Sequence, residues 1–197
     1  MPRTFDIAVI QGDGIGPEVT REAIRAVEAA AVLDEASFQW SDFPWGTDHY
    51  FEHGRMAPED FLDTLTAHDA ILLGAVGHPD VQDHITLNGL LLPIRRQFDQ
   101  CVCLRPSYLY DGVASPLRDK PPGSIDIQVF RENTEGEYAN VGGRLYADRP
   151  HDVAVQTSVF TRHGCRRIIE AAFEKAATRP ARHVASITKS NAQGYGM

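Results

Sequence analysis

Residues 5–19 of the chain read FDIAVIQGDGIGPEV. The apolar run Phe5–Ile10 has the length of a β-strand and stops at a glycine-rich turn. Pro17 then occupies the position that proline prefers at the start of a helix, because the missing N–H would have no partner there. Apolar side chains follow at helical spacing, at Val19, Ala23, Val27 and Ala30. A strand, a tight turn and an amphipathic helix in this order predict an α/β fold.

The glycine-rich loop GDGIGP, residues 12–17, differs from two common nucleotide-binding patterns. The dinucleotide pattern GxGxxG requires glycine where this chain has Pro17, and the P-loop requires a lysine followed by serine or threonine. Two interpretations remain open. The glycines supply backbone angles for a tight turn, or the loop approaches a ligand closely.

The first half of the chain contains further predicted elements. A helix is expected near Pro58, followed by the apolar run AILLGAV at 70–76, which suits a strand buried on both faces. Residues 87–98 combine a helical pattern with Gly89 and Pro93. We therefore expect a helix there that starts late or is kinked.

Strand-like runs dominate the second half, at Val102–Leu104, Ser124–Phe130, Asp152–Phe160 and His183–Thr188. The segment 110–123 is rich in glycine and proline and is predicted to be a loop, and a helix is expected at Arg162–Ala177. This shift in pattern predicts two domains. Residues 1–103 would form an α/β domain with an open sheet, and residues 104–197 a smaller, strand-rich domain.

The composition excludes several classes of partner. The 197 residues include 27 acidic residues against 19 lysines and arginines, so the net charge is −8 and the pI is about 5.4. Such a chain does not attract phosphate backbones or anionic lipids, so we expect neither nucleic acid nor membrane as partner. No apolar run approaches the roughly 18 residues that span a bilayer, and the N-terminal residues do not resemble a secretory signal. We therefore expect a cytoplasmic protein.

Cysteines and candidate metal ligands give no strong pattern. Cys101, Cys103 and Cys165 form no CxxC pair and are expected to be reduced. His49 and His53 are four residues apart, but residue 50 is not the glutamate that HExxH requires. A further group, Glu132, Glu135 and Glu137, is loosely spaced and favours a solvated loop. We predict no metal ligands in this chain.

Arginines gather near the ends of the predicted strands. Arg105 follows VCL and Arg131 follows IDIQVF, while Arg95 and Arg96 lie in LPIRRQF. A guanidinium binds a carboxylate through parallel hydrogen bonds and keeps its charge at any working pH. This set predicts a site for a small di- or tricarboxylate.

Tyr138 and Lys189 are candidate acid–base groups. Lys189 follows a predicted strand, and nearby arginines would destabilise its charged form, which favours a role as base. Taken alone, each residue also fits an ordinary surface position.

Six motifs in order carry a resemblance to a known family. They are GDGIGPEV at 12–19, LLGAVGHPD at 72–80, LLLPIRRQFDQ at 90–100, LRP at 104–106, VFRENTEGEY at 129–138 and TKSN at 188–191. Together they resemble the β-decarboxylating dehydrogenases, which include isopropylmalate, isocitrate and tartrate/D-malate dehydrogenases. The stretches RENTEGEY, VGGRLY and SVFTRHGCRRI are most similar to the tartrate/D-malate branch.

The resemblance implies an isopropylmalate/isocitrate dehydrogenase-like fold and a role for each matching residue. Arg95, Arg105 and Arg131 would bind the carboxylates of the substrate, and Tyr138 and Lys189 would be catalytic. The implied reaction is NAD-dependent oxidative decarboxylation of a 2-hydroxy dicarboxylic acid such as D-malate or tartrate, with Mg²⁺ or Mn²⁺ as Lewis acid.

Two further roles follow from the same resemblance. Asn191 would lie near the nicotinamide of the cofactor. A homodimer is implied, in which residues 138–160 clasp the mate and the catalytic lysine enters the partner's site.

The family's metal-binding aspartates and adenosine-binding loop lie after the TKSN motif. The resemblance therefore implies a truncated fold with an incomplete second domain, and we expect this chain not to turn over substrate unaided. An alternative is a non-catalytic remnant that binds a small carboxylate or a homologous chain. Another is an isopropylmalate dehydrogenase, for which Leu91 and Leu92 would supply an apolar wall, although Asn88 argues against it.

Overall fold

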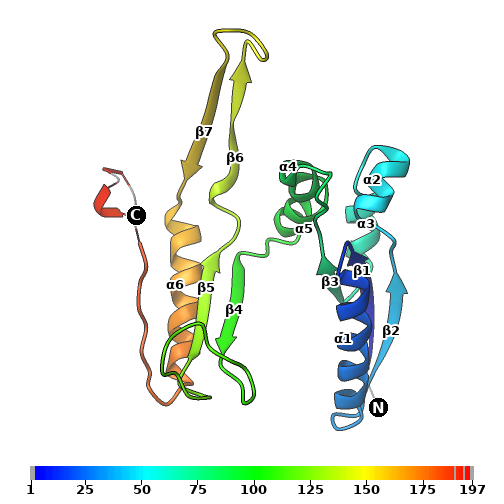
Figure 1. The fold of residues 1–197 in the computed structure, drawn as a ribbon, viewed down its shortest axis with the longest axis vertical. Coiled ribbons are helices and arrows are strands. Elements are labelled where there is room, and N and C mark those ends of the chain that lie inside the picture. The colour runs from blue at the N-terminus through cyan, green and yellow to red at the C-terminus, as the bar shows by residue number, and fades with distance from the viewer. Residues whose placement is uncertain (1–2, 189, 193, 196–197) are drawn as a thin grey trace. The chain divides into compact units, whose positions relative to one another are not determined.

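The computed structural model describes residues 3–188, 190–192 and 194–195 (Figure 1). The chain forms two compact units, residues 1–97 (unit 1) and residues 98–197 (unit 2). The domain change that we predicted between residues 103 and 104 would fall inside a strand of unit 2.

Unit 1 is built around three parallel strands in the order β2-β1-β3. They are β1 (Arg3–Gly12), β2 (Ala36–Asp42) and β3 (Ala70–Ala75). The central strand is paired on both sides, with Ile7 between Trp40 of β2 and Ala70 of β3. Helix α1 (Gly16–Ala31) lies against this sheet and begins directly after the glycine turn. The predicted strand, turn and helix are thus confirmed.

The glycine turn is shaped by a close approach to the chain itself. Gly12 and Gly14 have positive φ angles of 71° and 57°. A Cβ atom on Gly12 would lie 1.9 Å from the carbonyl oxygen of Ala75, so a larger residue does not fit. This geometry supports the tight-turn interpretation of the loop.

The remaining elements of unit 1 are short helices: α2 (Thr47–His53), α3 (Phe61–Thr66), α4 (Asp83–Thr86), η1 (Leu87–Leu91) and α5 (Leu92–Gln97). The last three follow one another without a break, and η1 is a π-helical turn. It ends two residues before Pro93, which has no N–H to donate to the preceding turn. The predicted helix is present but does not start late: its helical residues begin at Asp83, and its irregularity is the π-helical turn.

Asp13 joins three loops of unit 1. Its Oδ1 accepts a hydrogen bond from the backbone N–H of Thr47 at 2.6 Å. Its Oδ2 accepts from the Thr47 hydroxyl at 2.6 Å and from the Gly77 N–H at 2.8 Å. The side chain is buried, so these donors replace water around a carboxylate. The loops that follow β1, β2 and β3 are therefore fixed to one another at the same edge of the sheet.

Replacing Asp13 with asparagine should destabilise unit 1 by about 2–3 kcal/mol, because an amide nitrogen would face a donor in place of an accepting oxygen. The two tryptophans, Trp40 and Trp45, both lie in unit 1, so their fluorescence during urea unfolding follows this unit. Asp48→Asn, at an exposed site on α2, is the matched control. An unfolding midpoint for Asp13→Asn equal to that of the unchanged chain would contradict the role of this carboxylate.

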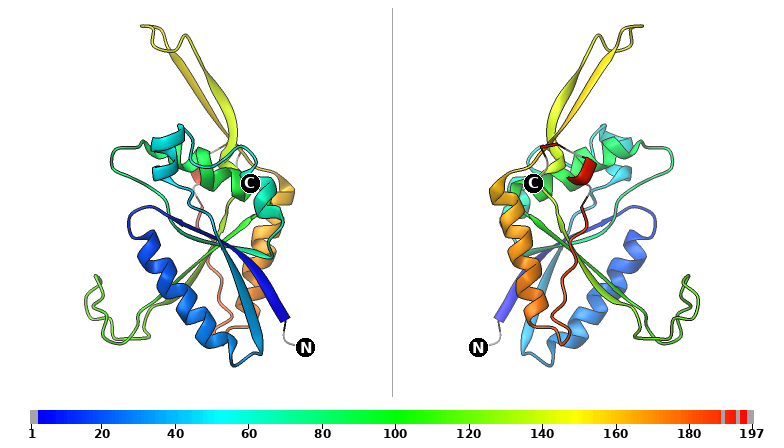
Figure 2. Two further views of the ribbon diagram at one scale, coloured as in Figure 1. Left: turned by 90° about the vertical axis from the view of Figure 1, so that its right-hand side faces the viewer. Right: turned by 90° about the vertical axis from the view of Figure 1, so that its left-hand side faces the viewer.

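Unit 2 contains two antiparallel strand pairs and one long helix. Strand β4 (Val102–Tyr108) pairs with β5 (Asp126–Glu132), and β6 (Gly136–Leu145) pairs with β7 (Val153–Val159). Figure 2 shows the β6–β7 pair from two sides as a long ribbon. Helix α6 (Arg162–Ala177) packs against β5. The predicted strands at 102–104, 124–130 and 152–160 and the helix at 162–177 are confirmed, and the predicted loop at 110–123 contains no helix or strand.

The predicted strand at His183–Thr188 is wrong. These residues pair with no strand of the described chain, and Ile187 is almost fully exposed. A strand requires a neighbour to receive its backbone hydrogen bonds, and an apolar alternating sequence does not supply one. A short 3₁₀ turn, η2 (Ser190–Ala192), follows.

Among the helices in the described residues, none is both long and apolar enough to cross a membrane. Cys101, Cys103 and Cys165 are free thiols, as the sequence predicts.

Candidate functional site

Two of the predicted carboxylate-binding arginines lie on one face of the β4–β5 pair. The register places Cys103 opposite Arg131 and Arg105 opposite Val129. Side chains of directly opposite residues share a face, and alternate residues along a strand do so as well. Arg105 and Arg131 are therefore diagonal neighbours on the same face.

Helix α6 binds the other face of β5. Arg167 of α6 has its guanidinium 3.9 Å from the carboxylate of Glu132, and Arg179, just after the helix, forms an ion pair with Asp126 at 2.6 Å. Both acids belong to the alternate set of β5 residues, which points away from Arg131. The arginine face is thus the side of the β4–β5 pair that α6 leaves uncovered.

Arg131 is held among polar side chains at the β5–β6 turn. Its Nη2 donates to the Asn133 side-chain oxygen at 2.8 Å, and its Nη1 lies 3.5 Å from the Tyr138 hydroxyl. Its guanidinium carbon lies 5.3 Å from the centre of the Tyr138 ring, within cation–π range. The buried Nε has no hydrogen-bond partner among the described residues. The structure therefore brings together two residues that the sequence predicts to act on the substrate.

The charges on the two faces differ. In the described part of the chain, Arg105 and Arg131 form no ion pair with a carboxylate, and the Nε of Arg105 lies 3.4 Å from the Cys103 sulfur. Arg167, by contrast, donates to Asp99 at 2.7 Å, and this hydrogen bond raises the pKa of the guanidinium above its usual value. The charge of Arg167 is thus balanced by Asp99 within the fold, whereas no described carboxylate pairs with Arg105 or Arg131, which suits them to bind an anion.

The other predicted site residues lie elsewhere. Arg95 is in α5 of unit 1 and is half-buried. Asn191 is exposed in η2. Lys189 lies outside the described residues.

The glutamates near Arg131 are used in hydrogen bonds within the fold. The carboxylate of Glu132 accepts from the N–H groups of Thr134 and Glu135, and that of Glu135 accepts from the N–H and hydroxyl of Thr161. Over residues 3–188, 190–192 and 194–195, no three His, Cys, Asp or Glu residues form a group that could hold a metal ion. The described residues therefore do not supply a site for the divalent metal that the sequence resemblance implies.

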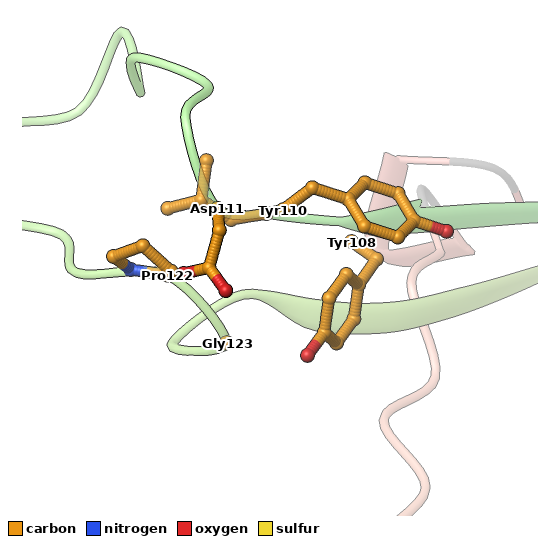
Figure 3. A pocket seen from close by; sticks show the side chains of 6 residues that line it. Tyr108, Tyr110, Asp111, Pro122 and Gly123 are labelled. Carbon is orange, nitrogen blue, oxygen red and sulfur yellow. The ribbon is translucent and has the colours of Figure 1, made fainter.

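A hollow of about 500 Å³ lies in the loop that joins β4 to β5 (Figure 3). It is lined by Tyr108, Leu109, Tyr110, Asp111, Pro122 and Gly123. The lining contains a carboxylate and no cationic side chain, so it does not suit a dicarboxylate. The arginine face therefore remains the candidate site.

Asn133 is the site residue that sequence reasoning missed. It lies inside RENTEGEY among Glu132, Glu135 and Glu137, and its residue type alone does not indicate a role. Its contact with Arg131 depends on the turn after β5, which the residue pattern does not reveal.

Comparison with known proteins identifies the family. A sequence model of the isocitrate/isopropylmalate dehydrogenase family matches residues 6–195. The chain belongs to this family. Its resemblance to β-decarboxylating dehydrogenases is thereby confirmed.

Two curated relatives of this isocitrate/isopropylmalate dehydrogenase family member cover nearly its whole length. It is 49% identical to the D-malate dehydrogenase (decarboxylating) of Escherichia coli K12, over 100% of this chain and 55% of that protein. It is 46% identical to the tartrate dehydrogenase/decarboxylase of Pseudomonas putida, over 98% of this chain and 54% of that protein. The chain spans about half the length of these relatives.

Solved structures confirm the fold class. Isocitrate dehydrogenase from Methylococcus capsulatus matches with a TM-score of 0.72 and 26% identity, over 88% of this chain and 48% of that one. A β-decarboxylating dehydrogenase from Thermococcus kodakarensis matches with a TM-score of 0.57 and 31% identity, over 88% of this chain and 46% of that one. The isopropylmalate/isocitrate dehydrogenase-like fold expected from the sequence is thus present over about half its length.

This family member is expected to bind Mn²⁺ weakly by itself, with a dissociation constant above about 1 mM, because hard cations require several oxygen ligands in one place. The loss of the electron paramagnetic resonance signal of free Mn²⁺ during a titration measures this binding. Stoichiometric binding of one Mn²⁺ ion per chain at micromolar concentration would contradict the prediction.

Proposed function

We propose that this chain supplies the carboxylate-binding part of a site for NAD-dependent oxidative decarboxylation of a 2-hydroxy dicarboxylic acid, D-malate or tartrate. The observation that carries the proposal is the pair Arg105 and Arg131, which share one face without a carboxylate partner in the described chain. The names of the relatives from Escherichia coli and Pseudomonas putida support this substrate class.

Each residue has a separate task in the proposal. Arg105 and Arg131, together with Arg95, bind and orient the carboxylates of the substrate. Tyr138 lies against Arg131 and supplies the proton to the carbon that loses CO₂. Lys189 takes the proton of the substrate hydroxyl, and Asn191 lies beside the nicotinamide.

The metal and the cofactor require groups beyond those described. The described residues offer no metal-binding group, and Asn191 is exposed. We propose that groups outside the described residues hold Mg²⁺ or Mn²⁺ and, together with Asn191, NAD⁺, and that this chain alone does not turn over substrate.

The β6–β7 ribbon is the proposed contact between two copies of the chain. Val141, Leu145, Val153 and Val155 are apolar side chains of this ribbon and are all strongly exposed. Monomeric proteins seldom expose so many apolar side chains together. We propose that the ribbon forms the clasp of a homodimer.

Two alternatives can be compared with the structure. A non-catalytic role in binding a small carboxylate or a homologous chain would use the same arginine face and ribbon. An isopropylmalate site would require an apolar wall from Leu91 and Leu92, but Leu92 is buried in the core of unit 1. The burial of Leu92 supports D-malate or tartrate over isopropylmalate, whose isopropyl group would need this side chain at its surface.

Calorimetric titration with D-malate and with tartrate tests the substrate site. Arg131→Met and Arg105→Met should each weaken binding roughly tenfold or more, because each removes charge-assisted hydrogen bonds. Arg149→Met, at an exposed position between β6 and β7, should leave the affinity unchanged. Equal affinities for all three variants would contradict the proposal.

A second measurement tests whether turnover needs groups beyond this chain, and NADH formation would also exclude the non-catalytic alternative. The chain alone, with NAD⁺, Mn²⁺ and D-malate, should form no NADH. NADH formation by the purified 197-residue chain would show that the proposed dependence on further groups is wrong.

A further inference from the structure

Asn133 is buried, and both polar atoms of its side-chain amide form hydrogen bonds. It is 5% exposed. Its Oδ1 accepts from Arg131 Nη2 at 2.8 Å, and its Nδ2 donates to the carbonyl oxygen of Gln100 at 3.2 Å. Its backbone N–H donates to the carbonyl oxygen of Cys101 at 3.0 Å. These bonds tie the end of β5 to the segment that leads into β4.

The bonds also fix which way the amide points. A rotation by 180° would place the NH₂ group against the guanidinium and the oxygen against the Gln100 carbonyl, so that two donors and two acceptors would face each other. Because Oδ1 must face Arg131, the guanidinium is held through Nη2 by a group that is itself held in place.

The second terminal nitrogen of the Arg131 guanidinium, Nη1, has a longer contact. Nη1 lies 3.5 Å from the Tyr138 hydroxyl, at the outer limit for a hydrogen bond, whereas Nη2 lies at the ordinary distance from Asn133. Nη1 of Arg131 and the Tyr138 hydroxyl are therefore close enough for both to donate hydrogen bonds to one bound anion.

We propose that Asn133 is a positioning residue, which fixes the guanidinium of Arg131 so that Nη1 and the Tyr138 hydroxyl meet one carboxylate of the substrate. The part concerning substrate rests on the function proposed above. The part concerning Arg131 does not, since it is a property of the chain without ligand.

Nuclear magnetic resonance of the arginine side chains tests the positioning directly. In the unchanged chain, the two Nη groups of Arg131 should give separate ¹⁵N signals, because the bond to Asn133 slows rotation about the Nε–Cζ bond. In Asn133→Leu, of nearly the same volume, these signals should merge. Arg131→Lys assigns the signals. Gln156→Leu is the matched control, since Gln156 also donates to a backbone carbonyl, that of Glu137 at 3.3 Å, without touching Arg131.

Asn133→Asp separates position from charge. It loses the donor to Gln100 but keeps an oxygen against Nη2 and strengthens that bond with a charge, so the two Nη signals should stay separate, while its negative charge offsets that of Arg131. D-malate affinity should therefore fall roughly tenfold in both Asn133 variants and stay unchanged in Gln156→Leu.

Separate Nη signals in folded Asn133→Leu, or merged signals in Asn133→Asp, would overturn the positioning role. Merged signals in Asn133→Leu with unchanged D-malate affinity would overturn its importance for substrate. If the unchanged chain binds no D-malate while its Nη signals behave as expected, the proposed function fails and the role of Asn133 toward Arg131 stands.

Discussion

The register of the β4–β5 pair places Cys103 opposite Arg131, and the rest of unit 2 depends on this alignment. A shift by one residue would turn Arg131 toward α6 and bring the acids of the alternate set to the arginine face, because side chains alternate along a strand. The ion pair between Asp126 and Arg179, which follows α6, opposes such a shift, because the shift would turn Asp126 to the opposite face of the strand pair. The same pairing therefore packs the helix on one face and keeps the positive charge on the other.

In unit 1, the carboxylate of Asp13 holds the loops at one edge of the sheet. Parallel strands end at the same edge of a sheet, where their loops leave N–H groups that need acceptors. Asp13 accepts from the loops after β2 and β3 and itself belongs to the loop after β1. Gly46 can approach Asp13 because it has no Cβ atom; a Cβ there would lie only 2.6 Å from Asp13 Oδ1. The glycines of this edge are thus required by the packing of the chain on itself.

The sequence predicted those features that depend on neighbouring residues. The strand and helix around GDGIGP, helix α6 and the arginines near strand ends all follow from local spacing. Three features were not predictable in this way. Strand β2 mixes serine, glutamine and aspartate with its aromatic residues, so its pairing with β1 determines it more than its composition does. Residues 183–188 have strand-like composition but no partner, and the contacts of Asn133 and Asp13 join segments that are distant in sequence.

We propose above that a dicarboxylate binds to the face that carries Arg105 and Arg131. Titration of the ¹⁵N-labelled chain with D-malate, followed through its backbone amide signals, locates the bound ligand. The largest shifts should cluster at Cys103–Arg105 and Val129–Asn133. Shifts confined to the glycine turn of unit 1 or to the hollow beside Tyr108 and Tyr110 would contradict it.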